Sequence, residues 1–240
     1  MIWGLDVSHH NAPSAVPWRD VRGGFAFLRA TFGSTGVDKA ATEHAARAVG
    51  EGCQAIGAYH YLKADSGGGD QARHFFERVD QLEQVTGRLA IAVDVEDMPP
   101  PHPPWDPSIY TSRLYAFLDV VQKAGRVCAV YIAPWQAAKM GLDARIGACP
   151  LWLAHWVPVP KTPKPWSDWQ IWQYGIDSSI DRNRYRGSVA ELRALFGLDG
   201  PALTYDTLGP VTTAVRAAEG RGATVETFVS RDEGPVIDGR

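Results

Sequence analysis

Long apolar segments are missing from this 240-residue chain. No run reaches the roughly 18 consecutive apolar residues that a membrane-spanning helix needs, so we expect no membrane insertion. The first residues, 1–6, have neither the basic start nor the apolar centre of a secretory signal peptide. We therefore expect synthesis in the cytoplasm without such a leader.

Cysteine is scarce and charge of one sign is never clustered. The three cysteines, Cys53, Cys128 and Cys149, are odd in number and form no CxxC metal motif. Cys53 and Cys128 stand beside apolar runs and are expected to be buried as small hydrophobic residues. The 24 Lys and Arg against 27 Asp and Glu give a formal charge of −3 without any basic run. This argues against nucleic acid as a partner, because such proteins need a clustered basic surface.

Tryptophan, by contrast, is abundant. Nine tryptophans exceed the needs of a core of this size, and the 45% hydrophobic composition allows a sizeable core. Tryptophan is rarely buried completely and usually keeps its N–H for a partner. The surplus indicates either a crowded barrel or a site where flat rings meet flat ligands.

Strand and helix patterns alternate along the first 200 residues. Strands are predicted at 2–8, 25–31, 54–62, 89–96, 128–133, 151–156, 169–174 and 178–183. Helices are predicted at 40–52, 69–86, 107–124 and 189–196. Alternation favours parallel strands with right-handed crossovers, so the fold class is α/β, a single irregular β/α barrel. The chain is too short for eight full helices, so the last strands are expected to lack long ones.

Residues 200–240 differ in character from the barrel predicted for residues 1–199. This short C-terminal extension has no tryptophan, and its patterns indicate only one helix at 211–220 and one strand at 224–230. Its role stays open between a partly ordered extension and a small docking or oligomerisation element. We expect the protein to be a monomer.

Acidic residues at strand ends give the strongest local signal. Asp94 and Glu96 lie two positions apart on a strand, so their side chains point to the same face. Burial and mutual repulsion should raise the pKa of at least one of them. One protonated acid beside one ionised carboxylate is what glycosidic cleavage requires. Asp6 and Asp181 end other strands and join the same rim, unless each strand simply ends in solvent.

The histidines give no comparable signal. His9 and His10 are adjacent, so they point to different sides of an extended chain, and no partner follows at metal-ligand spacing. No metal site is predicted. His60 and His155 lie within predicted strands and fit buried core histidines better than catalytic bases.

Eight motifs occur in a specific order along residues 2–198. They are Gly4-Leu5-Asp6-Val7-Ser8 with Asn11, Phe27-Leu28-Arg29-Ala30-Thr31, Gly57-Ala58-Tyr59-His60-Tyr61, Asp94-Val95-Glu96, Tyr131, Leu151-Trp152-Leu153-Ala154, Trp169-Gln170-Ile171-Trp172-Gln173-Tyr174 and Ile180-Asp181-Arg182-Asn183. Each motif alone is weak, but their order makes the set specific. With these motifs the chain resembles glycoside hydrolase family 25, the muramidases also called Chalaropsis-type lysozymes.

The resemblance implies a (β/α)5(β)3 barrel that hydrolyses the β-1,4 bond between N-acetylmuramic acid and N-acetylglucosamine in peptidoglycan glycan strands, without a cofactor. It implies Glu96 as the general acid. Asp94 would be its partner, acting on the substrate acetamido group, on water or on the developing positive charge. Asp6 and Asp181 would be the remaining acids of the rim. The residues implied to line the substrate site are Tyr59, Tyr61, Tyr131, Trp152, Trp172 and Gln173.

The chain departs from the family pattern around the groove. Phe32 and Gly33 follow Thr31, where many relatives carry an acidic residue before the glycine. Tyr61 stands where relatives often have phenylalanine, and Trp135 and Trp156 add aromatic bulk on late loops. These changes bear on fine specificity rather than on the reaction class.

Two other functions would use some of the same features. A non-catalytic glycan-binding module would keep the groove and the tryptophans without turnover. A metal-dependent polysaccharide deacetylase would need a His/Asp triad, whose spacing the sequence lacks. The favoured route to the bacterial cell wall is that of a phage endolysin released through a holin, or of a virion-associated lysin. Export of a bacterial protein without a cleaved signal is the alternative.

Overall fold

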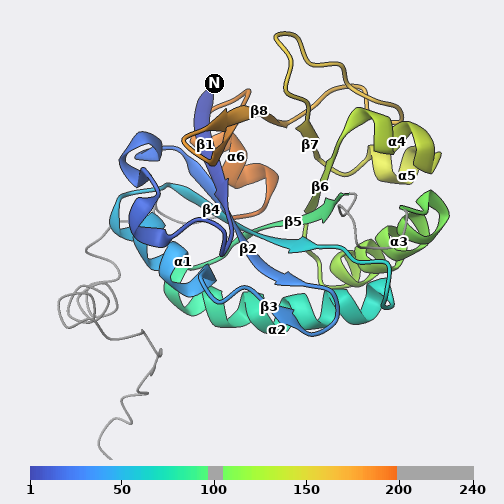
Figure 1. Ribbon diagram of the computed structural model, residues 1–240, viewed down its shortest axis with the longest axis horizontal. Helices are drawn as coiled ribbons and strands as arrows, with labels where there is room; N and C mark the ends of the chain where they lie inside the picture. Colours follow the sequence, from blue (N-terminus) through green and yellow to red (C-terminus); the bar gives the residue numbers. More distant parts are fainter. Residues whose placement is uncertain (97–104, 199–240) are drawn as a thin grey trace, which may run out of the picture.

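Eight strands close into one barrel in the residues that this computed structural model describes, 1–96 and 105–198 (Figure 1). The ring runs β1-β9-β8-β7-β6-β5-β4-β2, and β2 pairs with β1 to close it. The strands are β1 (Ile2–Val7), β2 (Phe25–Phe32), β4 (Ala55–Tyr61), β5 (Ala90–Val95), β6 (Cys128–Ile132), β7 (Leu151–Ala154), β8 (Ile171–Asp177) and β9 (Ile180–Tyr185), with the short β3 (Gly36–Val37) at the end of β2. All eight predicted strands are confirmed, and β3 was not predicted.

One strand of the ring runs against the others. The pairings from β1 through β2, β4, β5, β6 and β7 to β8 are parallel, whereas β9 is antiparallel to both β8 and β1. A tight turn joins β8 to β9, with Ser178 and Ser179 at φ 51° and 66°. Because β9 returns directly, its first residues lie beside the last residues of its neighbours. Asp181 of β9 is consequently in register with Asp6 of β1.

Helices cover the outside of the ring, mainly along its first half (Figure 1). They are α1 (Ala41–Gly50), α2 (Gly68–Thr86), α3 (Pro107–Lys123), α4 (Pro134–Met140), α5 (Ala144–Gly147) and α6 (Val189–Leu195), with two 3-10 turns at Pro13–Ala15 and Trp18–Val21. The four predicted helices are confirmed; α4 and α5 were missed. Both are short, so the late part of the barrel lacks long helices, as expected. The helix and strand predicted at 211–220 and 224–230, like the whole extension 200–240, lie outside the described residues.

Alternation along the strands separates two apolar cores. On β5, Ala90, Ala92 and Asp94 face the inside of the barrel, while the residues between them pack against the outer helices. Small inner residues leave space for large rings from β2 and β7. Phe27 and Trp152, for example, lie with ring centroids 4.6 Å apart inside the barrel.

The inner core is closed at one end by α6. Phe196 contacts Phe27 edge-on with ring centroids 6.1 Å apart, and Arg193 donates to the carbonyl of Gln54, just before β4 begins. Leu198 is buried in the same inner core. The end of the barrel at which the parallel strands begin is therefore filled, and the opposite end is left for a site.

The cysteines lie where the sequence predicted. All three are free thiols, and Cys53 and Cys128 are buried among apolar residues. The helices of the described residues include none with the length and apolar character of a bilayer span.

Candidate active site

A cavity of about 650 Å³ opens at the end of the barrel where the parallel strands finish. Asp6, Asp94, Glu96 and Asp181 all line it. They come from β1, β5 and β9, which the ring brings together although the residues are far apart in sequence. The four acids predicted from strand ends therefore share one site.

Asp94 near the end of β5 and Glu96 one residue beyond it face this cavity from alternate positions of the chain. Asp94 is only 6% exposed, and its Oδ1 has no hydrogen-bond partner among the described residues. Burial raises the pKa of Asp94 well above its ordinary value, and the nearby charges of Glu96 and Asp6 raise it further. Burial also raises the pKa of Glu96, while a hydrogen bond from Tyr131 opposes that rise. Both carboxyls are thus easier to protonate than in water.

Asp6 is held by two amide side chains. Its Oδ2 accepts from Nδ2 of Asn183 over 2.7 Å and from Nε2 of Gln173 over 3.1 Å. Burial raises the pKa of Asp6 to about 6, although these two hydrogen bonds favour the ionised form. Asn183 also accepts from Nε1 of Trp152 over 2.8 Å, so one buried amide fixes both an acid and a ring.

Asp181 completes the acidic rim. It is half-buried, and burial together with the charges of Asp6 and Glu96 raises its pKa to about 8. Four interacting carboxyls in one cavity cannot all ionise at neutral pH without strong repulsion. The site therefore retains protons in the pH range where exposed carboxyls have lost them.

Gln173 links the acids to the aromatic wall. Its Oε1 accepts from Nε1 of Trp156 over 3.0 Å and lies 2.9 Å from the Tyr131 hydroxyl, whose single proton can be donated either to Gln173 or to Glu96. Gln173 lines both cavities, is 3% exposed, and contacts Asp6, Tyr131 and Trp156 through its amide; its role in binding substrate stays a prediction. Its observed contacts make it a positioning residue for those three side chains.

The predicted tyrosines line the cavity. Tyr59, Tyr61 and Tyr131 are each less than 10% exposed, and all three face the inside of the barrel. Burial, followed by the charges of the neighbouring acids, raises the pKa of each hydroxyl. These groups stay neutral, and the hydroxyls of Tyr59 and Tyr61 can donate hydrogen bonds to a ligand.

The two predicted sugar platforms are not placed as expected. Trp172 lies beside Gln173 on β8 and therefore points the opposite way, into the outer core, where its Nε1 donates to the carbonyl of His155. Trp152 does border the cavity, but it is 1% exposed and packed inside the barrel. Neither ring offers an open face at the cavity. Sequence reasoning thus selected the wrong face of β8.

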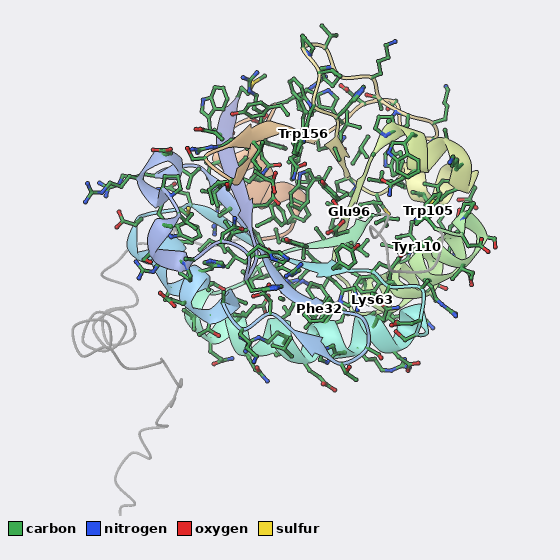
Figure 2. All side chains as sticks on the ribbon, in the orientation of Figure 1. Phe32, Lys63, Glu96, Trp105, Tyr110 and Trp156 are labelled. Carbon is green, nitrogen blue, oxygen red and sulfur yellow. The ribbon has the colours of Figure 1, made fainter. Side chains whose placement is uncertain are left out.

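Trp156 has the open ring that the prediction sought. It is 54% exposed, lines the cavity and is fixed through the Nε1 bond to Gln173. Figure 2 places it on the opposite side of Glu96 from Phe32 and Lys63. A second cavity of about 500 Å³ shares Glu96 and Trp156 with the first and extends to Trp135 and His155. The two cavities form a groove with Glu96 at their junction.

The wall opposite Trp156 carries basic side chains. Arg29, His9, His10 and Lys63 line the cavity there together with Phe32. None of these residues was among the predicted site residues. Arg29 stands inside a recognised motif, so its position at the end of β2 could have indicated it.

His60 is a buried structural residue. It is fully buried with its ring between Thr31 (2.8 Å from Nδ1) and Gln71 (3.0 Å from Nε2), and burial lowers its pKa to about 4. His155 borders the second cavity and accepts from the backbone N–H of Lys161. In the ranges 1–96 and 105–198, no group of three or more His, Cys, Asp or Glu is arranged to hold a metal ion.

An α/β barrel with several carboxyls in a groove at the C-terminal ends of its strands has the parts that a glycoside hydrolase needs. Residues 5–182 match the family model described as glycosyl hydrolases family 25, and the chain belongs to this family. It is therefore a glycoside hydrolase, as predicted.

Named relatives agree with this assignment. Lysozyme M1 of Streptomyces globisporus is 26% identical over 216 residues, which cover 81% of this chain and 71% of that protein. The solved bacterial lysozyme of Streptomyces coelicolor is 26% identical with a TM-score of 0.66, covering 83% of this chain and 98% of that one. A muramidase from Acremonium alcalophilum shares the fold at 24% identity and a TM-score of 0.68, over 83% of this chain and 100% of that one. Endolysin structures also share the fold.

Proposed function

We propose that this chain is a muramidase that hydrolyses the β-1,4 bond between N-acetylmuramic acid and N-acetylglucosamine in peptidoglycan. One observation carries the proposal: four carboxyls meet in a single groove, and burial raises the pKa of each. This is the chemistry that glycosidic cleavage needs, with a proton donor beside a second carboxylate. The lysozyme and muramidase names of the relatives support the same substrate class.

Glu96 is the general acid in this proposal. It lies where the two cavities join, so a bond of a glycan strand that spans both would pass beside it. Burial raises the pKa of Glu96, which keeps a proton available near neutrality. Glu96 gives this proton to the leaving sugar oxygen, and the charge left on the enzyme is held by the Tyr131 hydroxyl.

Asp94 acts as the partner carboxylate. Its Oδ1 is buried without a partner among the described residues, so it can accept the N–H of a substrate acetamido group. A protonated Glu96 no longer repels Asp94, and a substrate hydrogen bond favours the ionised form of Asp94. Asp94 then stabilises the positive charge that develops on the sugar, directly or through the acetamido group. Water adds to this sugar carbon and returns a proton to Glu96, which completes the hydrolysis.

Asp6 and Asp181 support this division of roles electrostatically. The charge of Asp6 acts together with burial to raise the pKa of Glu96, and the pKa of Asp181 responds to both residues. Tyr59 and Tyr61 are neutral donors for sugar hydroxyls. Trp156 offers the flat face on which a sugar ring can stack, in place of Trp172.

The test is Glu96→Gln, which keeps the size of the side chain and removes the proton donor. Clearing of a suspension of purified peptidoglycan should fall by at least 100-fold, the typical contribution of a general acid. Glu77→Gln is the matched control, because Glu77 is exposed on α2. Activity near wild type in Glu96→Gln would remove Glu96 from this role.

Product analysis separates the alternative functions. A muramidase releases new reducing ends, and mass spectrometry of the digest identifies muramic acid at those ends. A glycan-binding module releases none. A metal-dependent deacetylase would change acetylation instead of chain length and would lose activity in EDTA.

For the route to its substrate, we propose a phage endolysin released through a holin pore, acting on the bacterial cell wall as a monomer and without a cofactor. The fold shared with endolysin structures is consistent with this origin. Residues 1–199 would form the catalytic unit and residues 200–240 a separate extension. Lysis of cells from outside, compared with lysis after co-expression with a holin, tests the route.

A further inference from the structure

The groove has one acidic side and one basic side. The basic wall is formed by Arg29 at the end of β2, His9 and His10 after β1, and Lys63 after β4. In Figure 2, Phe32 and Lys63 lie together on one side of Glu96, and Trp156 lies on the other. A ligand stacked on Trp156 beside the acids would therefore have the basic wall within reach.

Most of this basic charge is already compensated by Asp38. Nε of Arg29 lies 2.9 Å from Oδ2 of Asp38, whose side chain is fully buried. The same carboxylate oxygen accepts from the backbone N–H of His9 and lies 3.3 Å from its Nδ1. Arg29 and His9 are thus tied to the structure of the wall.

Lys63 differs because it has no carboxylate partner in the described ranges 1–96 and 105–198. Its ammonium lies over the ring of Phe32, 5.3 Å from the centroid. A cation–π contact of this kind attracts the cation but does not neutralise it.

The backbone of Lys63 is fixed through both its N–H and its carbonyl group. The buried amide of Gln71 accepts from the backbone N–H of Lys63 over 2.9 Å and donates to its carbonyl over 2.8 Å. Its side chain runs over Gly33, where an added Cβ would come within 3.1 Å of Cδ. Gly33 also has φ +57°, which favours glycine. Asp65 lies beside the same glycine, with Oδ1 3.9 Å from the added Cβ, yet Lys63 forms no ion pair among the described residues. A cation with a fixed backbone and no ion-pair partner is suited to binding an anion.

We propose that Lys63, supported by Phe32, binds a free carboxylate of the peptide stem carried by muramic acid. This inference rests on the proposed function, because it identifies a further part of the same substrate. The sugar rings themselves are uncharged, and the anionic groups of peptidoglycan lie on its stems. The Phe32 ring can contact the methyl groups of the lactyl ether and the alanine residues, so the wall matches both the charge and the apolar surface of a stem.

The experiment compares two forms of one peptidoglycan. In the first the stem carboxylates are free, and in the second carbodiimide and ammonia have converted them to primary amides. The ratio of kcat/KM on the free form to that on the amidated form is measured for wild type and Lys63→Met. We expect this ratio to fall about tenfold in Lys63→Met, the size of one charge-assisted hydrogen bond. Lys63→Arg should keep most of the wild-type ratio. The control is Lys123→Met, because Lys123 is exposed at the end of α3, and this variant should keep the full ratio.

Other outcomes identify other causes. An equal loss on both forms in Lys63→Met would overturn the proposal, since it would mean a structural role. Hydrofluoric acid removes phosphate-containing wall polymers. If this treatment abolishes the difference in kcat/KM between the free and amidated forms, the site binds phosphate and the proposal is overturned. Lack of wild-type activity on both forms would instead mean that the proposed muramidase function is wrong.

Discussion

Asn183 donates from Nδ2 to Oδ2 of Asp6 over 2.7 Å, from β9 to the adjacent strand β1. Asn183 is fully buried, and its other amide atom accepts from the indole of Trp152. One side chain therefore couples the ionisation of an acid in the groove to the packing of the inner core.

Replacing Asn183 by leucine should disturb both partners. Asn183→Leu keeps a similar volume but leaves the indole N–H of Trp152 without its acceptor and Asp6 without one donor. We expect a loss of about 2–4 kcal/mol in the free energy of unfolding, measured by urea denaturation. The pKa of Asp6 should rise further, because a bond that favours its ionised form is gone. A loss below about 0.5 kcal/mol would contradict this coupling.

Removing the Tyr131 hydroxyl should move the pH profile. The hydrogen bond from Tyr131 counteracts the rise that burial causes in the pKa of Glu96. In Tyr131→Phe the acid should hold its proton to higher pH, so the alkaline limb of kcat against pH should shift upward. The magnitude of kcat should fall as well, because the charge left on Glu96 loses its donor. If kcat falls but the alkaline limb of its pH profile does not shift, Tyr131 does not donate to Glu96.

The two tryptophans at the end of β7 and on β8 should respond oppositely to truncation. Trp156→Ala removes an exposed ring from the groove and should lower kcat/KM about tenfold or more with little effect on stability. Trp172→Ala removes a ring that is 7% exposed in the outer core and should cost about 3–5 kcal/mol of stability. Thermal unfolding and turbidity assays on both variants check the contrast. If both variants lose the same activity per folded molecule, Trp172 contributes to the active site and the prediction is wrong.

Stability should depend on pH through Asp6. Burial raises its pKa to about 6, above the value of about 3.9 in an unfolded chain. Asp6 therefore contributes stability that is complete below pH 4 and is lost as the pH rises through 6. In Asp6→Asn this loss, about 3 kcal/mol, should be absent, so that the variant gains on wild type at pH 7 while losing activity. Urea denaturation at pH 4 and pH 7 checks this. The prediction is wrong if the free energy of unfolding changes by the same amount between the two pH values in wild type and in Asp6→Asn.

The barrel was predictable because its strands are apolar on both faces and separated by helical patterns. The same reasoning placed Asp94 and Glu96 together, since alternate residues on a strand share a face. Applied to β8, it would also have shown that Trp172 and the neighbouring Gln173 cannot both face the groove. The resemblance placed Trp172 in the groove, whereas the two-residue period of β8 places it on the outer face.

Other features depend on contacts that no local pattern carries. Trp156 lies two residues beyond the end of β7, where alternation no longer predicts direction, and its place depends on the distant Gln173. The helices α4 and α5 are too short to give a clear period. The basic wall was missed because its members come from three separate loops and strand ends, and only the closed ring brings them together.

The packing of α6 has a consequence for joining this protein to others. Because α6 fills the end of the barrel opposite the groove and Leu198 is buried beside it, the described chain ends on the side away from the carboxyls. A fluorescent or affinity domain fused directly after Leu198 would start behind the enzyme, and a surface coupled through that point would hold the groove facing outward toward an approaching cell wall.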